Sequence, residues 1–297
     1  MLDRDERDET QVRNFKTAFS ILPGEFKDRV AFLITLSGIP LGILIELIFV
    51  FPHYYDFYSF DAVFHGAVTI FFVQNIYLNL WMILRTDASG KSSKLPHVLQ
   101  PNWKYCYVCK LNCPPRAYHC HACKECILKR DHHSMFIGRC VGYHNHRYYL
   151  VMVSSMFVLS NYALWFHGNH TWSTITSGYG TLYGIWFLIM PQFAFLAQFL
   201  SLSQFWAASC LTSSLIAAFG STALFVSQIF CIWRGQTREE YWTRVRAYDR
   251  GPKANFADVL GDRPIIAFLC AFAQSNLSGD GLKFPTGVPI RDGLKDL

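Results

Sequence analysis

Four long stretches of nearly unbroken apolar residues divide this chain of 297 residues. They cover residues 30–51, 63–84, 148–166 and 211–233, and Glu46 is the one charged residue within them. Each has about the length that a helix needs to cross ~30 Å of hydrocarbon, whereas most helices of soluble proteins keep a polar face. The pattern predicts an all-α polytopic membrane protein with four transmembrane helices.

A fifth apolar segment, residues 182–206, is more polar than the other four. The residues that interrupt it are Pro191, Gln192, Gln198, Ser201, Ser203 and Gln204. A fifth crossing would also place the C-terminal cations on the opposite side of the membrane from all the others. We therefore interpret residues 182–206 as a re-entrant or interfacial apolar helix that packs on the bundle.

The 27 Lys and Arg residues predict the orientation of the chain. Residues 1–29 hold six, residues 85–147 eleven and residues 234–297 ten, whereas residues 52–62 and 167–233 hold none. Positive residues stay on the cytoplasmic side of a membrane, so the N-terminus, the region between the second and third spans and the C-terminus should be cytosolic. We expect the membrane to be an endomembrane, of the ER or the Golgi.

These patterns divide the chain into five parts. They are a cytosolic N-terminal segment (1–29), transmembrane helices 1 and 2 (30–84), a cytosolic Cys-rich domain (85–147), transmembrane helices 3 and 4 with the extra apolar segment (148–233), and a cytosolic C-terminal region (234–297). The formal net charge of +6 indicates affinity for anionic lipid headgroups or an anionic substrate. We expect no nucleic-acid partner, because no basic stripe stands free of the membrane segments.

Candidate chemistry is concentrated between Cys106 and Cys140, which enclose seven of the ten cysteines and four histidines. Repeated Cys-x2-Cys pairs with later Cys and His residues are typical of structural zinc sites. Disulfides are not expected in the cytosol, where thiols are kept reduced. Two closed zinc sites need eight ligands and more than eight candidates are present, so the spacing alone leaves the ligand assignment open.

These residues resemble the Cys-rich domain of the DHHC protein S-acyltransferases, or palmitoyltransferases. The shared patterns are Cys106-x2-Cys109, His119-Cys120-x2-Cys123-x2-Cys126, Asp131-His132-His133 and Cys140-Val141-Gly142-x2-Asn145. Two further family motifs are similar to Gln236-Thr237-Arg238-Glu239 and to the region around Asn255. The resemblance implies multi-pass enzymes that move a fatty acyl group from acyl-CoA, such as palmitoyl-CoA, to cysteines of substrate proteins.

The resemblance also implies site residues, position by position. One Zn²⁺ falls on Cys106, Cys109, His119 and Cys126, and the other on Cys120, Cys123, His133 and Cys140. His132 becomes the general base, Asp131 its orienting acceptor, and position 134 the nucleophile. Thr237, Glu239, Asn255 and Asn145 become motif residues of structural importance.

Ser134 stands where this family has its catalytic cysteine. A cysteine thiol has a pKa of ~8.5 and is a few per cent thiolate near neutrality, whereas a serine hydroxyl must lose its proton to a strong base during the reaction. We therefore expect little turnover by the standard two-step route. The alternative function is a catalytically inactive membrane adaptor or regulator that binds acyl-CoA or substrate proteins.

Overall fold

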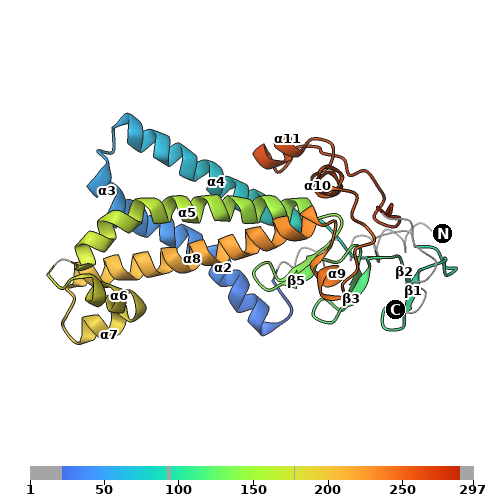
Figure 1. The fold of residues 1–297 in the computed structure, drawn as a ribbon, viewed down its shortest axis with the longest axis horizontal. Coiled ribbons are helices and arrows are strands. Elements are labelled where there is room, and N and C mark those ends of the chain that lie inside the picture. The colour runs from blue at the N-terminus through green and yellow to red at the C-terminus, as the bar shows by residue number, and fades with distance from the viewer. Residues whose placement is uncertain (1–21, 92–94, 177, 288–297) are drawn as a thin grey trace, which may run out of the picture.

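Four long helices are the largest elements of the computed structural model, which describes residues 22–91, 95–176 and 178–287 (Figure 1). They are α2 (Phe26–Ile45), α4 (Phe60–Arg85), α5 (His146–Thr176) and α8 (Leu202–Trp233). All four contain segments long and apolar enough to cross a membrane. The prediction of a mostly helical, four-span membrane protein is therefore confirmed. After α2 the chain continues through a π-helical turn, η1 (Glu46–Val50), and the short α3 (Phe51–Tyr54).

The core of the bundle lies where α2, α4 and α5 meet, at the end of the helices nearest the Cys-rich domain. Phe32 of α2, Ile83 of α4 and Tyr149 of α5 belong to one buried cluster. Away from this contact the helices expose large apolar side chains such as Leu44 and Phe219. Apolar surface of this kind on a membrane helix is the surface that lipid covers.

The extra apolar segment does not form a span. It folds into α6 (Thr181–Ile189), α7 (Pro191–Leu196) and the start of α8, and a helix of nine residues is only about 14 Å long at ~1.5 Å per residue. Its polar residues have local roles, because Pro191 opens α7 and Ser201 with Gln204 forms the capping box of α8. Phe187 of α6 is buried against the far ends of α5 and α8.

The Cys-rich domain contains three β-hairpins that the hydropathy pattern did not predict. They are β1 (Lys104–Cys106) with β2 (Leu111–Cys113), β3 (Tyr118–Cys120) with β4 (Glu125–Ile127), and β5 (His132–Ser134) with β6 (Arg139–Val141). The strands are only three residues long, too short for a hydropathy period to be visible. Figure 1 shows the domain at one end of the helices, beside the C-terminal elements.

The three hairpins repeat every fourteen residues. Their last first-strand residues are Cys106, Cys120 and Ser134, which pair with Leu111, Glu125 and Arg139. The residue before the second strand has a positive φ in each, at Lys110 (53°), Lys124 (56°) and Gly138 (63°). Ser134 therefore has the place in the third hairpin that a cysteine has in the other two.

The C-terminal region forms three short helices, α9 (Arg238–Trp242), α10 (Pro252–Leu260) and α11 (Pro264–Leu269). Val259 and Leu260 of α10 pack on Leu150 and Val151 of α5 and on Ile232 of α8. This contact fixes the C-terminal region to the same ends of α5 and α8 that carry the Cys-rich domain.

Candidate active site and metal centres

Two clusters of Cys and His side chains have the arrangement of zinc ligands. Cys106, Cys109, His119 and Cys126 form the first, and Cys120, Cys123, His133 and Cys140 form the second; within each cluster the ligand atoms lie within 4.8 Å of one another. These are the two sets that the family resemblance implies. Cys113 and His121 belong to neither cluster.

The distances within each cluster fit a tetrahedral ion. His119 Nδ1 lies 3.2 Å from Cys109 Sγ, and His133 Nδ1 lies 3.3 Å from Cys123 Sγ and 3.7 Å from Cys140 Sγ. With Zn–S of ~2.3 Å and Zn–N of ~2.0 Å, neighbouring ligands of one zinc ion are about 3.5 Å apart. Three thiolates and one imidazole are a usual donor set for structural zinc, so the residues fit two Zn²⁺ ions.

The second hairpin joins the two metal centres. Its strands supply His119 and Cys126 to the first cluster, while Cys120 and Cys123 at its turn belong to the second. The turns have the same local geometry, because the Cys109 amide donates to Cys106 Sγ (3.5 Å) and the Cys123 amide to Cys120 Sγ (3.4 Å). Two bound ions would therefore fix the three hairpins relative to one another.

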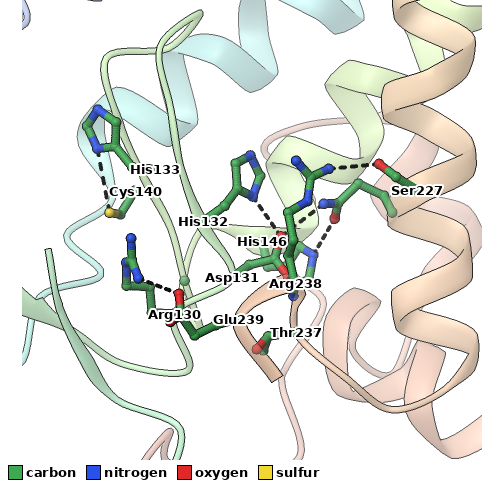
Figure 2. A network of polar contacts seen from close by, with 12 residues as sticks. Arg130, Asp131, His132, His133, Cys140, His146, Ser227, Thr237, Arg238 and Glu239 are labelled. Carbon is green, nitrogen blue, oxygen red and sulfur yellow. Dashed lines mark hydrogen bonds and ion pairs between the residues drawn. The ribbon is translucent and has the colours of Figure 1, made fainter. Parts of the chain in front are cut away.

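Asp131 is the centre of a buried polar network next to the third hairpin. Its carboxylate accepts hydrogen bonds from His132 Nδ1 (2.7 Å), from Gln228 Nε2 of α8 (2.9 Å) and from the backbone amide of Arg238 in α9 (2.8 Å). Figure 2 shows Asp131 between His132 and the segment that carries Arg238. Burial alone would raise the pKa of Asp131, but the hydrogen bonds from His132 and Gln228, with the nearby imidazoles, hold this pKa well below its ordinary value.

The contact with Asp131 orients the ring of His132. A carboxylate that accepts from Nδ1 fixes the imidazole tautomer and leaves Nε2 to accept a proton. His132 and Ser134 lie two residues apart on β5, so their side chains share one face of the strand. The ring of Tyr149 stands edge-on to that of His132 at 5.1 Å. Ser134 itself is buried, at 4% exposed.

The motif after α8 connects the Asp131 network to the Cys-rich domain. Thr237 caps α9 in a capping box with Glu240, which presents the Arg238 amide to Asp131. Glu239 forms an ion pair with Arg130 at 2.6 Å, drawn in Figure 2. Thr237 and Glu239, singled out from the sequence, thus both contact or support the candidate site.

Asn145 and Asn255 close two turns near the site. Asn145 accepts from the Gly142 amide (2.8 Å) and donates to the carbonyl of the metal ligand Cys140 (3.0 Å). Asn255 donates to the carbonyl of Trp233 at the end of α8 (3.0 Å) and accepts from a backbone amide in the preceding loop. Both side chains are buried and satisfy backbone groups, so they act as positioning residues.

Sequence reasoning missed several residues that hold this site together. Glu240 is buried and pairs in a bidentate manner with the Arg116 guanidinium at 2.6 and 2.7 Å. Gln228 binds both Asp131 and His146 (2.8 Å to His146). The signal for Gln228 was present, because it is the single Gln in the otherwise weakly polar stretch 211–233. Glu240 also had a local signal, because Thr237-x-x-Glu240 has the spacing of a capping box.

Comparisons with known proteins agree with this geometry. The family model described as DHHC palmitoyltransferase matches residues 99–245. The human protein named probable palmitoyltransferase ZDHHC24 is 34% identical over 230 residues, covering 75% of this chain and 79% of the relative. Its rat counterpart is 33% identical with the same coverage, and human palmitoyltransferase ZDHHC9 is 44% identical over 64 residues, 22% of this chain and 18% of the relative. The chain therefore belongs to the DHHC palmitoyltransferase family, within which serine ends its Asp-His-His motif.

Proposed function

We propose that this protein binds palmitoyl-CoA at the membrane surface and that the side chain at position 134, activated by Asp131 and His132, is the acceptor of its acyl group. The observation that supports this proposal is the Asp131–His132 hydrogen bond of 2.7 Å, on the same strand as Ser134. The zinc ions, when bound, hold the hairpins rigid. The proton transfer and the nucleophilic attack are carried out by side chains of the protein.

In the first step His132 Nε2 takes the hydroxyl proton while Ser134 Oγ attacks the thioester carbonyl. The C–S bond breaks, and CoA leaves as a thiol after receiving that proton. The product is an oxygen ester on Ser134. In the second step a cysteine thiolate of a substrate protein would have to attack this ester and form a thioester, which is higher in energy. The second step is therefore unfavourable, and turnover to protein cysteines is slow at best.

A second function, that of a non-catalytic adaptor, is favoured by Ser134 itself. Both Cys/His clusters and the Asp131 network are complete around a residue that is a poor nucleophile. A protein with this scaffold can still bind acyl-CoA or cysteine-containing substrate proteins and so regulate active relatives.

One labelling experiment separates the two functions. Full-length protein is incubated with a clickable palmitoyl-CoA analogue and then treated with neutral hydroxylamine, which cleaves thioesters. Label that resists hydroxylamine and disappears in Ser134→Ala supports acylation of Ser134. Absence of label in the wild type, with hydroxylamine-sensitive label in Ser134→Cys, supports the adaptor. Label in Ser134→Ala that hydroxylamine removes would contradict both, because another cysteine would then be the acceptor.

The proposed orientation places the Cys-rich domain and both terminal regions in the cytosol, in the ER or Golgi membrane. Two observations support it. The 27 Lys and Arg residues avoid residues 52–62 and 167–233, and in Figure 1 the Cys-rich domain lies with α9, α10 and α11 at one end of the long helices. This end would contact anionic headgroups and receive water-soluble CoA, and we propose no nucleic-acid partner.

A further inference from the structure

A buried carboxylate at the start of the first membrane helix contacts a ligand of the second metal centre. Asp28 lies in the first turn of α2 and is 2% exposed. Its Oδ2 is 2.8 Å from Nε2 of His133, a residue 105 positions later in the chain. An acid in a first helical turn often stabilises the helix dipole from the solvent side, but that role does not require burial against a histidine.

The opposite side of the His133 ring faces the metal cluster. Its Nδ1 lies 3.3, 3.6 and 3.7 Å from the sulfur atoms of Cys123, Cys120 and Cys140. An imidazole that binds zinc through Nδ1 carries its proton on Nε2, so Nε2 donates to Asp28. Such a carboxylate fixes the tautomer and orientation of the ligand and increases its basicity.

We propose that Asp28 is a positioning residue of the second zinc site, as the carboxylate of a carboxylate–histidine–zinc relay. Its role goes beyond the acyl transfer proposed above and does not depend on it. In the part of the chain that the structure describes, no carboxylate is hydrogen-bonded to the equivalent histidine of the first site, His119. Among the described residues no hydrogen bond reaches Nε2 of His119, whose ring instead stands edge-on to His121 at 5.1 Å.

The relay also joins the first membrane helix to the strand that carries the candidate active site. His133 lies between His132 and Ser134 on β5, and its side chain points to the other face of the strand. The same helix start makes a second contact with this hairpin, because Pro23 packs so closely on Gly138 that a Cβ there would lie 2.0 Å from Pro23 Cγ. Displacement of Asp28 should therefore disturb both the second zinc and the position of β5.

The test follows the release of each zinc ion from full-length protein in detergent. The variants are Asp28→Ala, which removes the carboxylate, and Asp28→Asn, which keeps an oxygen acceptor of similar shape. Glu25→Gln is the matched control, since Glu25 is an exposed acid at the N-cap of the same helix. A chelator with a zinc indicator gives the release rates. Quenching with N-ethylmaleimide and peptide mass spectrometry identify the cysteines that are set free.

At each site, the zinc ion should leave Glu25→Gln at the same rate as it leaves the wild type. In Asp28→Ala the second site should lose its zinc about 10–100-fold faster, with early labelling of Cys123 and Cys140, while Cys106 and Cys109 stay protected. In Asp28→Asn the rate of zinc release from the second site should lie between the rates of the wild type and of Asp28→Ala. The retained first ion reports that the variant is folded. Unchanged release from the second site, or equal acceleration at both sites in Asp28→Asn, would overturn the proposal.

Discussion

The carboxylate of Asp131 stays ionised although it is buried in the candidate site. Its carboxylate is 1% exposed and receives hydrogen bonds from three different segments. Because its pKa lies below the value of the unfolded chain, its contribution to stability is present above pH ~4 and is lost only as the pH falls further. At neutral pH the carboxylate is ionised and holds His132 in one tautomer.

Replacement of Asp131 by Asn should remove the carboxylate that holds His132 in one tautomer. An amide can present its NH₂ group to His132 Nδ1 and so favour the tautomer in which Nε2 carries the proton. In a Ser134→Cys background we expect autoacylation to fall about 10²–10⁴-fold, the usual contribution of a general base. The initial rate of hydroxylamine-sensitive labelling measures this effect. Asp262→Asn, at an exposed position, is the control, and equal rates in the two variants would contradict the role of Asp131.

Lys129 is a buried cation of the same region, near Arg116. It is 6% exposed, and burial, together with the charge of Arg116, lowers its pKa to about 7. In the unfolded chain the pKa returns to ~10.4. The folded state therefore binds fewer protons than the unfolded state between these values, and the stability penalty of Lys129 is full below pH ~7 and disappears as the pH rises toward ~10.

Replacement of Lys129 by Met should accordingly raise the melting temperature most at pH 7. The gain is on the order of a few kcal/mol there and should shrink between pH 7 and 9.5. Thermal unfolding in detergent at both pH values measures the gap between variant and wild type. Lys253→Met replaces an exposed lysine, and its melting temperature should equal that of the wild type at both pH values. A gap for Lys129→Met that is constant with pH would exclude titration as its cause.

At the scale of elements, the turn between β2 and β3 is tied to α9 by one ion pair. Arg116 and Glu240 have side chains that are 3% and 1% exposed, and the Arg116 guanidinium also lies 4.3 Å from the ring centre of Tyr248. Arg116 itself has a positive φ of 68°, so the chain holds a strained backbone position to make this contact. The pair connects the Cys-rich domain to the C-terminal region.

Removal of one residue of the Arg116–Glu240 ion pair should lower the free energy of unfolding more than replacement of both residues. Glu240→Gln leaves the Arg116 charge buried without its carboxylate, and we expect a loss of about 3–5 kcal/mol. The double variant Arg116→Met with Glu240→Leu should lose less stability, because no buried charge is left unpaired. Thermal unfolding measures both. The exposed pair Lys91–Glu125 is the matched control, since Lys91→Met should change stability by no more than ~1 kcal/mol. A similar loss in Glu240→Gln and Lys91→Met would show that burial does not determine the effect.

The sequence predicted these elements unevenly, for physical reasons. Hydropathy revealed the four long helices because lipid requires continuous apolar length, and ligand spacing revealed the metal residues because a turn brings nearby cysteines together. The contacts of Asp28 with His133 and of Arg116 with Glu240 join residues 105 and 124 positions apart, which no local pattern encodes. Ser201 and Gln204 had the pattern of a capping box, but within residues 182–206 they were interpreted only as polar interruptions.

In the molecule as a whole, we expect the stability of the Cys-rich domain to depend on metal more than on a hydrophobic core. Ligand residues themselves, Cys120 and Cys140, form half of its buried apolar cluster with Ala88 and Ile127. The four membrane helices, in contrast, are stabilised by lipid and by each other. The two parts should therefore respond differently when zinc is withdrawn.

A strong chelator should make residues 104–141 sensitive to protease while the membrane helices stay resistant. Limited proteolysis of the detergent-solubilised protein, followed by mass spectrometry, locates the cuts. Addition of the chelator already saturated with zinc is the control and should leave the domain protected. Identical cleavage with free and saturated chelator would mean that the domain folds without metal.

The fourteen-residue repeat of the hairpins explains how this chain tolerates serine at position 134. In the first two hairpins the equivalent residues, Cys106 and Cys120, belong to the two Cys/His clusters that could hold zinc. The third hairpin has Ile137 where the others have Cys109 and Cys123, and it contributes no turn cysteine to either cluster. Position 134 thus corresponds to a ligand position of the other hairpins but belongs to neither cluster. A substitution at position 134 therefore removes no ligand from either cluster, so it can change reactivity without removing a metal ligand that holds the hairpins together.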